Sequence, residues 1–228
     1  MSMITPVWTM IGLDVLMIVY TLWVLSTHKT LGRMGAAIAA ALLGWLLLLH
    51  VGLSGEHLFP SDISGPPFLA VIVGGVAGVG GLLWLITPIR KLLLSLDQRQ
   101  LLLLQGIRVF FGAGFLAQAS LGHLPQTFGI IDGITHIGAG FFGLVAAFSV
   151  AAGIDGNRRA WFANLFGLAD ILIVASSLAL ILLPDIGPHH SMMYAVFLPA
   201  PLWLWFHLIS IWKLMGRVGS LRQQHALA

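Results

Sequence analysis

Seven apolar segments, each about 20 residues long, constrain the fold of this chain more than any other feature. A helix of that length crosses the ~30 Å hydrocarbon core of a bilayer. Hydrophobic residues make up 58% of the 228 residues and charged residues only 8%, against roughly 25% charged residues in a soluble domain. The predicted helices are Thr5–Ser26, Met34–Leu53, Pro67–Thr87, Leu101–Ser120, Phe128–Ala152, Trp161–Leu183 and Ser191–Leu214. The sequence therefore predicts an all-α integral membrane protein, a seven-helix bundle that forms one domain over residues 1–228 and is surrounded by the lipid bilayer.

Ten of the eleven lysines and arginines lie between these segments or at the end of the last one, in stretches that would share one face of a membrane. They are Lys29, Arg33, Arg90, Lys91, Arg99, Arg158, Arg159, Lys213, Arg217 and Arg222. Lysine and arginine accumulate on the cytoplasmic face. We therefore expect a multi-pass inner-membrane protein with its N-terminus outside and its C-terminus in the cytoplasm. Because the basic residues are membrane anchors rather than a continuous basic stripe, they do not indicate nucleic-acid binding.

The chain contains no cysteine. Disulfides, cysteine-ligated zinc, iron–sulfur clusters and thiol catalysis are therefore excluded. The last apolar segment has a single lysine, Lys213, at its end, which argues against a retinal Schiff base in that helix. No residue is assigned as catalytic from the sequence.

Ionisable residues inside the apolar segments are the strongest pointers to a site, because charges in hydrocarbon are costly and face the bundle interior. They are Asp14, Arg108, Asp132, His136, Asp170 and His207, with His50 near the end of a segment. Counted from the basic anchors at 1.5 Å per residue, Arg108, Asp170 and His207 lie at a depth of roughly 9–16 Å. Asp14 and His50 lie at roughly 22–25 Å, and Asp132 and His136 begin a helix that enters from the other face. We therefore expect an inner group and an outer group.

In the inner group, Arg108 keeps its charge and so needs a carboxylate or a ring of carbonyls. Asp170 is the membrane carboxylate nearest to Arg108 in predicted depth. We expect a structural ion pair between them that ties the helix Leu101–Ser120 to the helix Trp161–Leu183. Arg108, Asp170 and His207 are also candidates for ligand binding or for a proton relay.

In the outer group, Asp132 and His136 are four residues apart and share one helix face. With His50 they form a candidate metal site, because imidazole and carboxylate ligands suit zinc, copper or iron. A haem, a structural hydrogen-bonded network and a proton or substrate path that includes Asp14 remain as alternatives. The sequence has no HExxH motif and no two histidines four apart, so the pattern does not choose among them.

The membrane carboxylates outnumber the membrane guanidinium by three to one. If Arg108 pairs with one carboxylate, two are left to carry a proton, to pair with a histidine, or to bind a cation. This balance favours a functional site over a purely structural network, although it does not name the ligand.

Three stretches of the sequence are expected to depart from a regular transmembrane helix. The third segment carries Gly74, Gly75, Gly78, Gly80 and Gly81, which predicts either close helix packing or a hinge. Pro199 and Pro201 each lack an amide donor and predict a kink or break in the last segment. The stretch Pro88–Gln100 has the mixed basic and leucine-rich character of a helix lying on the inner surface.

Three stretches between Gly106 and Leu214 resemble a group of uncharacterised bacterial integral membrane proteins. They are Gly129-Ile-Ile-Asp132-Gly, Asn164-Leu-Phe-Gly-Leu-Ala-Asp170, and Phe197-Leu-Pro199-Ala-Pro201 leading to His207-Leu-Ile-Ser. The resemblance implies a bacterial inner-membrane protein and carries no activity with it.

Three functions fit these features. The first is an outward-facing intramembrane pocket that binds a metal, a haem or a small ligand. The second is a proton-coupled small-molecule carrier that uses Asp14 and Asp132. The third is a non-catalytic subunit of a larger membrane complex, with other membrane subunits or copies of itself as partners.

Overall fold

The computed structural model describes residues 4–27 and 32–226, and within these ranges the regular structure is entirely helical. The all-α prediction is therefore confirmed for the part of the chain that is described. Lys29 lies outside the described residues, as do the side chains of Arg33, Arg217 and Arg222. The helices are α1 (Ile4–Ser26), α2 (Gly32–Ser54), α3 (Gly65–Leu85), α4 (Thr87–Ser95), α5 (Gln98–Leu103), α6 (Arg108–Ser120), α7 (Gln126–Ala152), α8 (Gly156–Ser177), the π-helical segment η1 (Leu178–Leu182), α9 (Leu183–Ile186), α10 (Met193–Phe197) and α11 (Pro199–Ala226).

Six helical stretches of the described chain are long and apolar enough to cross a membrane. They are Pro6–Ser26, Met34–Ser54, Gly65–Leu85, Gln98–Ser120, Gln126–Ala152 and Gly156–Ile186. Each contains most of one of the first six predicted segments. The structure is therefore that of a helical bundle suited to a multi-pass membrane protein.

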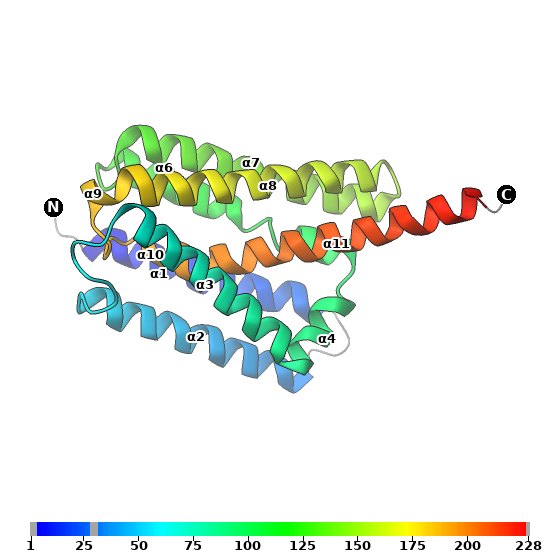
Figure 1. Cartoon of the computed structure of the whole chain (residues 1–228), viewed down its shortest axis with the longest axis horizontal. Coiled ribbons are helices and arrows are strands. Elements are labelled where there is room, and N and C mark those ends of the chain that lie inside the picture. Colours follow the sequence, from blue (N-terminus) through cyan, green and yellow to red (C-terminus); the bar gives the residue numbers. More distant parts are fainter. Residues whose placement is uncertain (1–3, 28–31, 227–228) are drawn as a thin grey trace.

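The long helices run side by side along the longest axis of the molecule (Figure 1). One end holds the α2–α3 and α6–α7 connections together with α9, and the other end holds α4, the α7–α8 connection and the C-terminal end of α11 (Figure 1). This second end carries Arg90 and Lys91 on α4, and Arg158 and Arg159 at the start of α8. Lys213 donates to the carbonyl of Leu94 at 2.7 Å, so it lies there too. We call it the basic end.

The predicted surface helix Pro88–Gln100 is present as α4 and the first turn of α5. Asp97 separates the two and caps α5. Its carboxylate accepts from the backbone N–H of Gln100 at 2.7 Å, and its own N–H donates to the side chain of Gln100 at 3.0 Å. This reciprocal pair is a capping box, which satisfies two donors that a helix start otherwise leaves open.

The predicted helix Leu101–Ser120 is interrupted, which the sequence did not indicate. Residues 104–107 form tight turns in which Gly106 N–H donates to Leu103 C=O at 2.8 Å and Arg108 N–H donates to Gln105 C=O at 3.1 Å. The Tyr20 hydroxyl also donates to Leu103 C=O at 2.7 Å. The interruption makes Arg108 the first residue of α6, and its side chain is fully buried.

The predicted break in the last segment is confirmed and lies at Leu198, between α10 and α11. Pro199 and Pro201 fall in the first turn of α11, where a missing amide donor is tolerated. In an unbroken helix the N–H of residue 201 would donate to the carbonyl of Phe197, and proline cannot do so. The indole N–H of Trp45 on α2 donates to that carbonyl instead, at 2.8 Å.

Glycines bring α6 and α7 into backbone contact. A Cβ atom added at Gly133 would lie 2.8 Å from the carbonyl oxygen of Gly112, and one added at Gly140 would lie 2.7 Å from the backbone nitrogen of Val109. Small residues at such positions allow helix backbones to approach closely. The close approach sets the start of α6, where Arg108 lies, against the middle of α7.

On α3, the prediction of close packing holds for two of the five glycines. The indole of Trp205 lies over Gly80 and leaves no room for a Cβ, and its N–H donates to Val76 C=O at 2.9 Å. A Cβ at Gly75 would touch the ring of Phe197 at 3.6 Å. Gly74, by contrast, has open space beside it. The glycines thus fix α3 against α10 and α11.

The connection between α9 and α10 is anchored by His190. Its Nδ1 accepts from the N–H of Met192 at 3.1 Å, so Nε2 carries the proton and donates to the carbonyl of His123 at 3.0 Å. Burial lowers the pKa of His190, the hydrogen bond to the His123 carbonyl raises it, and the nearby His123 charge lowers it, with a net decrease. His190 is therefore held as a neutral imidazole that links two connections at one end of the bundle.

Candidate functional site

Five ionisable side chains from four helices meet inside the bundle, and each is at most 5% exposed. Arg108 lies on α6, Asp132 and His136 on α7, Asp170 on α8 and His207 on α11. All five were predicted as site residues from the sequence. The surrounding helices are apolar, so these side chains can satisfy one another only through direct contacts.

The predicted ion pair between Arg108 and Asp170 is present. One guanidinium nitrogen, Nη2, donates to Oδ2 of Asp170. The other, Nη1, donates to the carbonyl of Gly167 at 3.3 Å and lies 3.1 Å from Nε2 of His207. The face of the guanidinium lies 5.3 Å from the ring centroid of Trp203, within the range of a cation–π contact. These contacts fix both the position and the charge of Arg108.

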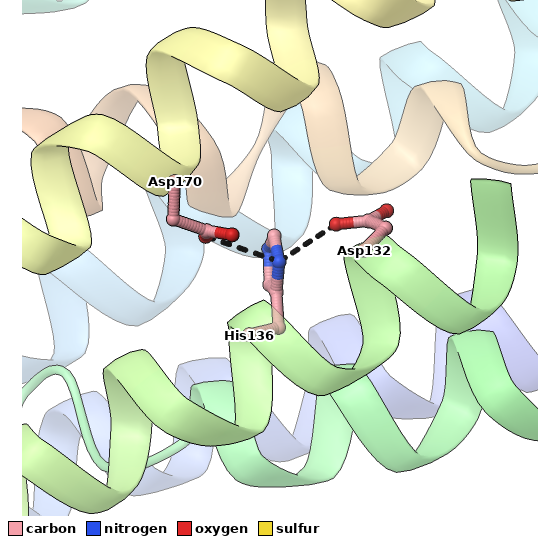
Figure 2. A group of neighbouring side chains, drawn as sticks. All are labelled: Asp132, His136 and Asp170. Atoms are coloured by element: carbon pink, nitrogen blue, oxygen red, sulfur yellow. Dashed lines mark ion pairs between the residues drawn. The ribbon is translucent and has the colours of Figure 1, made fainter.

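His136 connects the two carboxylates. Its Nδ1 lies 2.8 Å from Oδ1 of Asp132 and 3.2 Å from Oδ2 of Asp170. Figure 2 shows the imidazole pointing between the two carboxylates, one from its own helix and one from the neighbouring helix. Although these distances are short, neither carboxylate is aligned with the ring for a regular hydrogen bond. The imidazole is thus held by charge and position rather than by a directed bond.

This contact corrects the prediction of separate inner and outer groups. Asp132 and His136 were placed in the outer group and Asp170 in the inner one, yet His136 touches both carboxylates. The sequence count assigned Asp132 and His136 to the outer group only because their helix enters from that face. Counted from the α7–α8 connection, His136 lies 16 residues before the end of α7 at Ala152 and Asp170 lies 14 residues after the start of α8 at Gly156, so the two residues have nearly the same depth.

Several carboxylate oxygens in the cluster have no hydrogen-bond partner. Both oxygens of Asp132 and Oδ1 of Asp170 are buried without one. The ring of His136 is enclosed by aromatic side chains, with ring centroids 5.3 Å from Phe115 and 5.8 Å from Trp203. Buried acceptors of this kind are rare in folded proteins and call for a donor or a cation.

Asp14 and His50, the other two predicted members, lie elsewhere. Nδ1 of His50 lies 2.8 Å from the hydroxyl of Tyr194 and 3.3 Å from that of Ser54, and its ring is 6.1 Å from that of Trp8. Asp14 is fully buried, and neither of its oxygens has a hydrogen-bond partner. The structure therefore does not bring His50 to Asp132 and His136, as the predicted metal set requires; the side chain that meets them is that of Asp170.

A chain of polar side chains continues from His207 toward the basic end. Nδ1 of His207 lies 2.9 Å from Oδ1 of Asn164, whose Nδ2 donates to the Ser210 hydroxyl at 2.7 Å and to the Ala160 carbonyl at 2.8 Å. Gln98 donates to the same hydroxyl. The two bonds donated by Nδ2 of Asn164 fix the orientation of its amide, so Oδ1 faces His207. Because an amide oxygen can only accept, Nδ1 of His207 carries the proton and donates to it. Nε2 then accepts from Arg108, and His207 is neutral.

Asn164, Ser210 and Gln98 were not assigned a role from the sequence. A signal was present for Asn164: with Gly167 and Asp170 it recurs every three residues, which places all three on one side of α8. Gly167 is required there, because a Cβ would collide with the His207 ring and lie 3.1 Å from Nη1 of Arg108. Ser210 had the same signal, because it lies three residues after His207 on one face of α11, whereas Gln98 had none and meets Ser210 only through the packing of α5 on α11.

A cavity of about 50 Å³ adjoins the cluster and is open on one side. Its lining contains two ionisable residues, Asp132 and His136, and is otherwise apolar. The apolar lining consists of Ile72, Val76, Phe115, Ile171, Val174, Ala175, Leu178, Met192, Ala195, Val196, Ala200 and Trp203. The volume is enough for a few water molecules or a small functional group.

Asp132, His136 and Asp170 also form the group of side chains, among the described residues, that can supply three ligands to a metal ion. One ligand atom from each lies within 4.8 Å of the others. Two carboxylates and one imidazole suit zinc, manganese or iron, with an open position for water or substrate. Two of the three side chains, Asp132 and His136, line the cavity. Arg108, bound to Asp170, adds a positive charge next to the group.

Comparison with known families gives a single assignment. A family model described as a domain of unknown function (DUF8737) matches residues 66–215. The chain belongs to the DUF8737 family. The matched range contains all five members of the buried cluster and the whole of the cavity lining, whereas Asp14 and His50 lie outside it. No curated protein and no solved structure matches the chain.

Proposed function

We propose that this DUF8737 protein is a seven-span inner-membrane protein of bacterial origin, with its N-terminus outside and its C-terminus in the cytoplasm. The gathering of basic side chains at one end of the bundle supports this orientation. α11, which runs along α3 and α8, is the seventh span. A reporter fused after Ala228 is expected to be active only in the cytoplasm, and one inserted near Ser61 only outside. The reverse result at either point refutes the topology.

The function we propose is the binding of a small cationic ligand at Asp132, His136 and Asp170. The observation that carries it is the Asp132 carboxylate, which is 1% exposed and borders the cavity; its Oδ1 contacts Nδ1 of His136 at 2.8 Å, whereas its Oδ2 has no hydrogen-bond partner. A ligand that donates hydrogen bonds and carries a positive charge supplies what this carboxylate lacks.

The charge balance of the cluster supports a ligand with one positive charge. Asp132 and Asp170 contribute two negative charges, Arg108 contributes one positive charge, and His207 is neutral by its hydrogen bonds. The cluster therefore carries one net negative charge when His136 is neutral. An uncompensated charge is costly in a medium of low dielectric constant. A protonated amine restores neutrality, as does a proton on His136 in the empty site, and a divalent ion adds one charge more than is needed.

Thermal unfolding of the protein in nanodiscs tests this proposal, with n-butylammonium chloride as the probe and n-butanol as the uncharged control. A ligand present at 100 times its Kd stabilises the folded state by about 2.7 kcal/mol. We expect n-butylammonium, but not n-butanol, to raise the unfolding temperature of the wild type. Asp132→Asn should abolish the shift, while Asp14→Asn, which removes a buried carboxylate outside the cluster, should keep it. No shift in the wild type overturns the proposal, and a shift with ZnCl₂ or MnCl₂ in its place identifies a metal site.

A second candidate, a proton-coupled carrier, is favoured by the polar chain that runs from Asp132 to Gln98. The contacts through His136, Asp170, Arg108 and His207 link helices from both halves of the sequence. If the protein is a carrier, proteoliposomes with an entrapped pH dye should show proton movement when the ligand is added. Asp132→Asn should reduce that movement to the level of protein-free vesicles. Equal proton movement in wild type and variant argues against the carrier.

A further inference from the structure

The cavity beside Asp132 opens between two helices rather than toward a connection at the end of the bundle. Its half-buried lining residues are Val76 on α3, Val174 and Ala175 on α8, and Ala200 on α11, which packs against both helices. Ile72 on α3 and Ile171 on α8, which are buried, line its deeper part. The opening therefore lies on the long side of the bundle, where α3 and α8 run past each other.

The surface around this opening is apolar. Val73 on α3 and Leu172 and Ile173 on α8 are each close to 60% exposed. In a membrane protein such large exposed hydrophobic side chains face the lipid tails. Neither the opening nor the cavity walls contain a charged residue until Asp132 and His136 are reached. A molecule dissolved in the hydrocarbon can enter without crossing a polar surface, whereas a water-soluble one has no wet route along this side.

We propose that the ligand is a lipid-soluble amine, with one ammonium head and a linear apolar chain, and that it enters sideways from the bilayer between α3 and α8. This rests on the proposed binding of a cationic ligand. The ammonium head donates to Oδ2 of Asp132, which has no hydrogen-bond partner, and restores the charge balance of the cluster. The cavity of about 50 Å³ holds the head and the first carbon atoms. The rest of the chain lies in the opening and among the lipid tails.

Chain length separates this route from a closed pocket. A closed pocket of this volume rejects an amine once its chain exceeds the available space. A pocket open to the lipid accepts chains of any length, and the apparent affinity, referred to the aqueous concentration, rises by about fourfold per methylene as the amine partitions into the bilayer. We therefore expect n-octylammonium and n-dodecylammonium to bind with progressively higher apparent affinity than n-butylammonium.

Substitutions at the opening test the route independently of the charged end. Ala175→Trp fills the opening from α8, and Val76→Trp fills it from α3. Leu165→Trp is the matched control, because Leu165 is an exposed residue of the same helix that does not line the cavity and lies about 15 Å along the helix from Ala175. Binding is measured as the shift in unfolding temperature in nanodiscs of uncharged lipid, with Asp132→Asn and the corresponding alcohol as controls for effects of the amine on the bilayer.

We expect n-dodecylammonium to stabilise the wild type and Leu165→Trp, and to bind at least tenfold more weakly to Ala175→Trp. Val76→Trp takes the place of Ala175→Trp if that variant does not fold. Binding of n-butylammonium but not of n-dodecylammonium overturns the sideways route and leaves the cationic site intact. Undiminished binding of n-dodecylammonium to both Ala175→Trp and Val76→Trp also overturns the sideways route and leaves the cationic site intact. If none of the three amines stabilises the wild type, the proposed function fails as well.

Discussion

Replacement of Arg108 by leucine should destabilise the protein by about 3–5 kcal/mol, the usual cost of removing one partner of a buried ion pair. The structure shows why the cost is large. Arg108 is fully buried, and its loss leaves Asp170 without its guanidinium, together with the carbonyl of Gly167 and Nε2 of His207 without their donor. Asp170 alone carries a full charge among these groups, so it accounts for most of the loss.

The double variant Arg108→Leu with Asp170→Leu removes the stranded charge and keeps only the two neutral groups unsatisfied. A hydrogen bond between neutral groups inside a membrane bundle contributes about 0.6–1 kcal/mol. The double variant should therefore be less stable than wild type by only about 1–2 kcal/mol. Arg108→Leu alone is then less stable than the double variant by about 2–3 kcal/mol, and the coupling energy exceeds this difference by the cost of Asp170→Leu alone. Asp132 and His136 remain as a pair that can balance its own charge.

The measurement is reversible unfolding in mixed micelles, with the fraction of denaturing detergent raised stepwise and intrinsic tryptophan fluorescence as the signal. Asp14→Leu combined with Arg108→Leu is the control cycle, because Asp14 is also a buried carboxylate but is not part of the cluster. Its effects should be additive. A double variant no more stable than Arg108→Leu alone would show that the Arg108–Asp170 contact does not stabilise the fold, and the structural argument would then be wrong.

Three further predictions concern parts of the structure away from the charged pair. Gly140→Ala should destabilise the protein by about 1–3 kcal/mol because α6 and α7 must separate to admit the Cβ, whereas Gly74→Ala should change stability by less than about 0.5 kcal/mol; thermal unfolding of the two variants checks this, and equal effects would contradict the backbone contact. Because the pKa of His190 is lowered on folding, the unfolded chain takes up a proton below pH ~6.5 before the folded one does. Stability should therefore fall as the pH drops below that value, His190→Gln should flatten the profile, and the exposed His57→Gln should leave it unchanged; a flat wild-type profile would refute the argument. Asp97→Ala should lower stability by about 1 kcal/mol through loss of the α5 cap, and a denaturation midpoint equal to that of wild type would show that the cap is not needed.

The sequence predicted those features that follow from local chemistry. The segment lengths and the scarcity of charge predicted the helices, and the missing amides of Pro199 and Pro201 predicted the break at Leu198. The pairing of Arg108 with Asp170 was predictable because a guanidinium in a membrane needs a carboxylate and only one lay at a similar depth. For the break and for the ion pair, one residue type imposed a requirement that the fold had to meet.

The features that escaped prediction depend on how the helices pack. The interruption at residues 104–107 contains no proline. The carbonyl of Leu103, the last residue before it, accepts from the hydroxyl of Tyr20 on α1. His50 matched the metal pattern by composition, yet α2 places it beside Tyr194 rather than beside His136. The residues around the interruption and around His50 do not by themselves predict these contacts. Both were fixed by contacts between segments far apart in the chain.

The position of Arg108 has a consequence for the cell that carries this protein. The guanidinium lies between the carboxylate of Asp170 and the imidazole of His207, in the middle of the continuous line of polar groups through the bundle. A proton or metal ion that moved along this line would have to pass a permanent positive charge in a medium of low dielectric constant. The membrane potential supplies about 2.3 kcal/mol per elementary charge for each 100 mV, which is small beside the repulsion from a charge at contact distance. While Arg108 holds this position, the polar line opposes the passage of a proton or a metal ion, so a proton-coupled carrier would have to move the guanidinium away from His207 before a proton could cross.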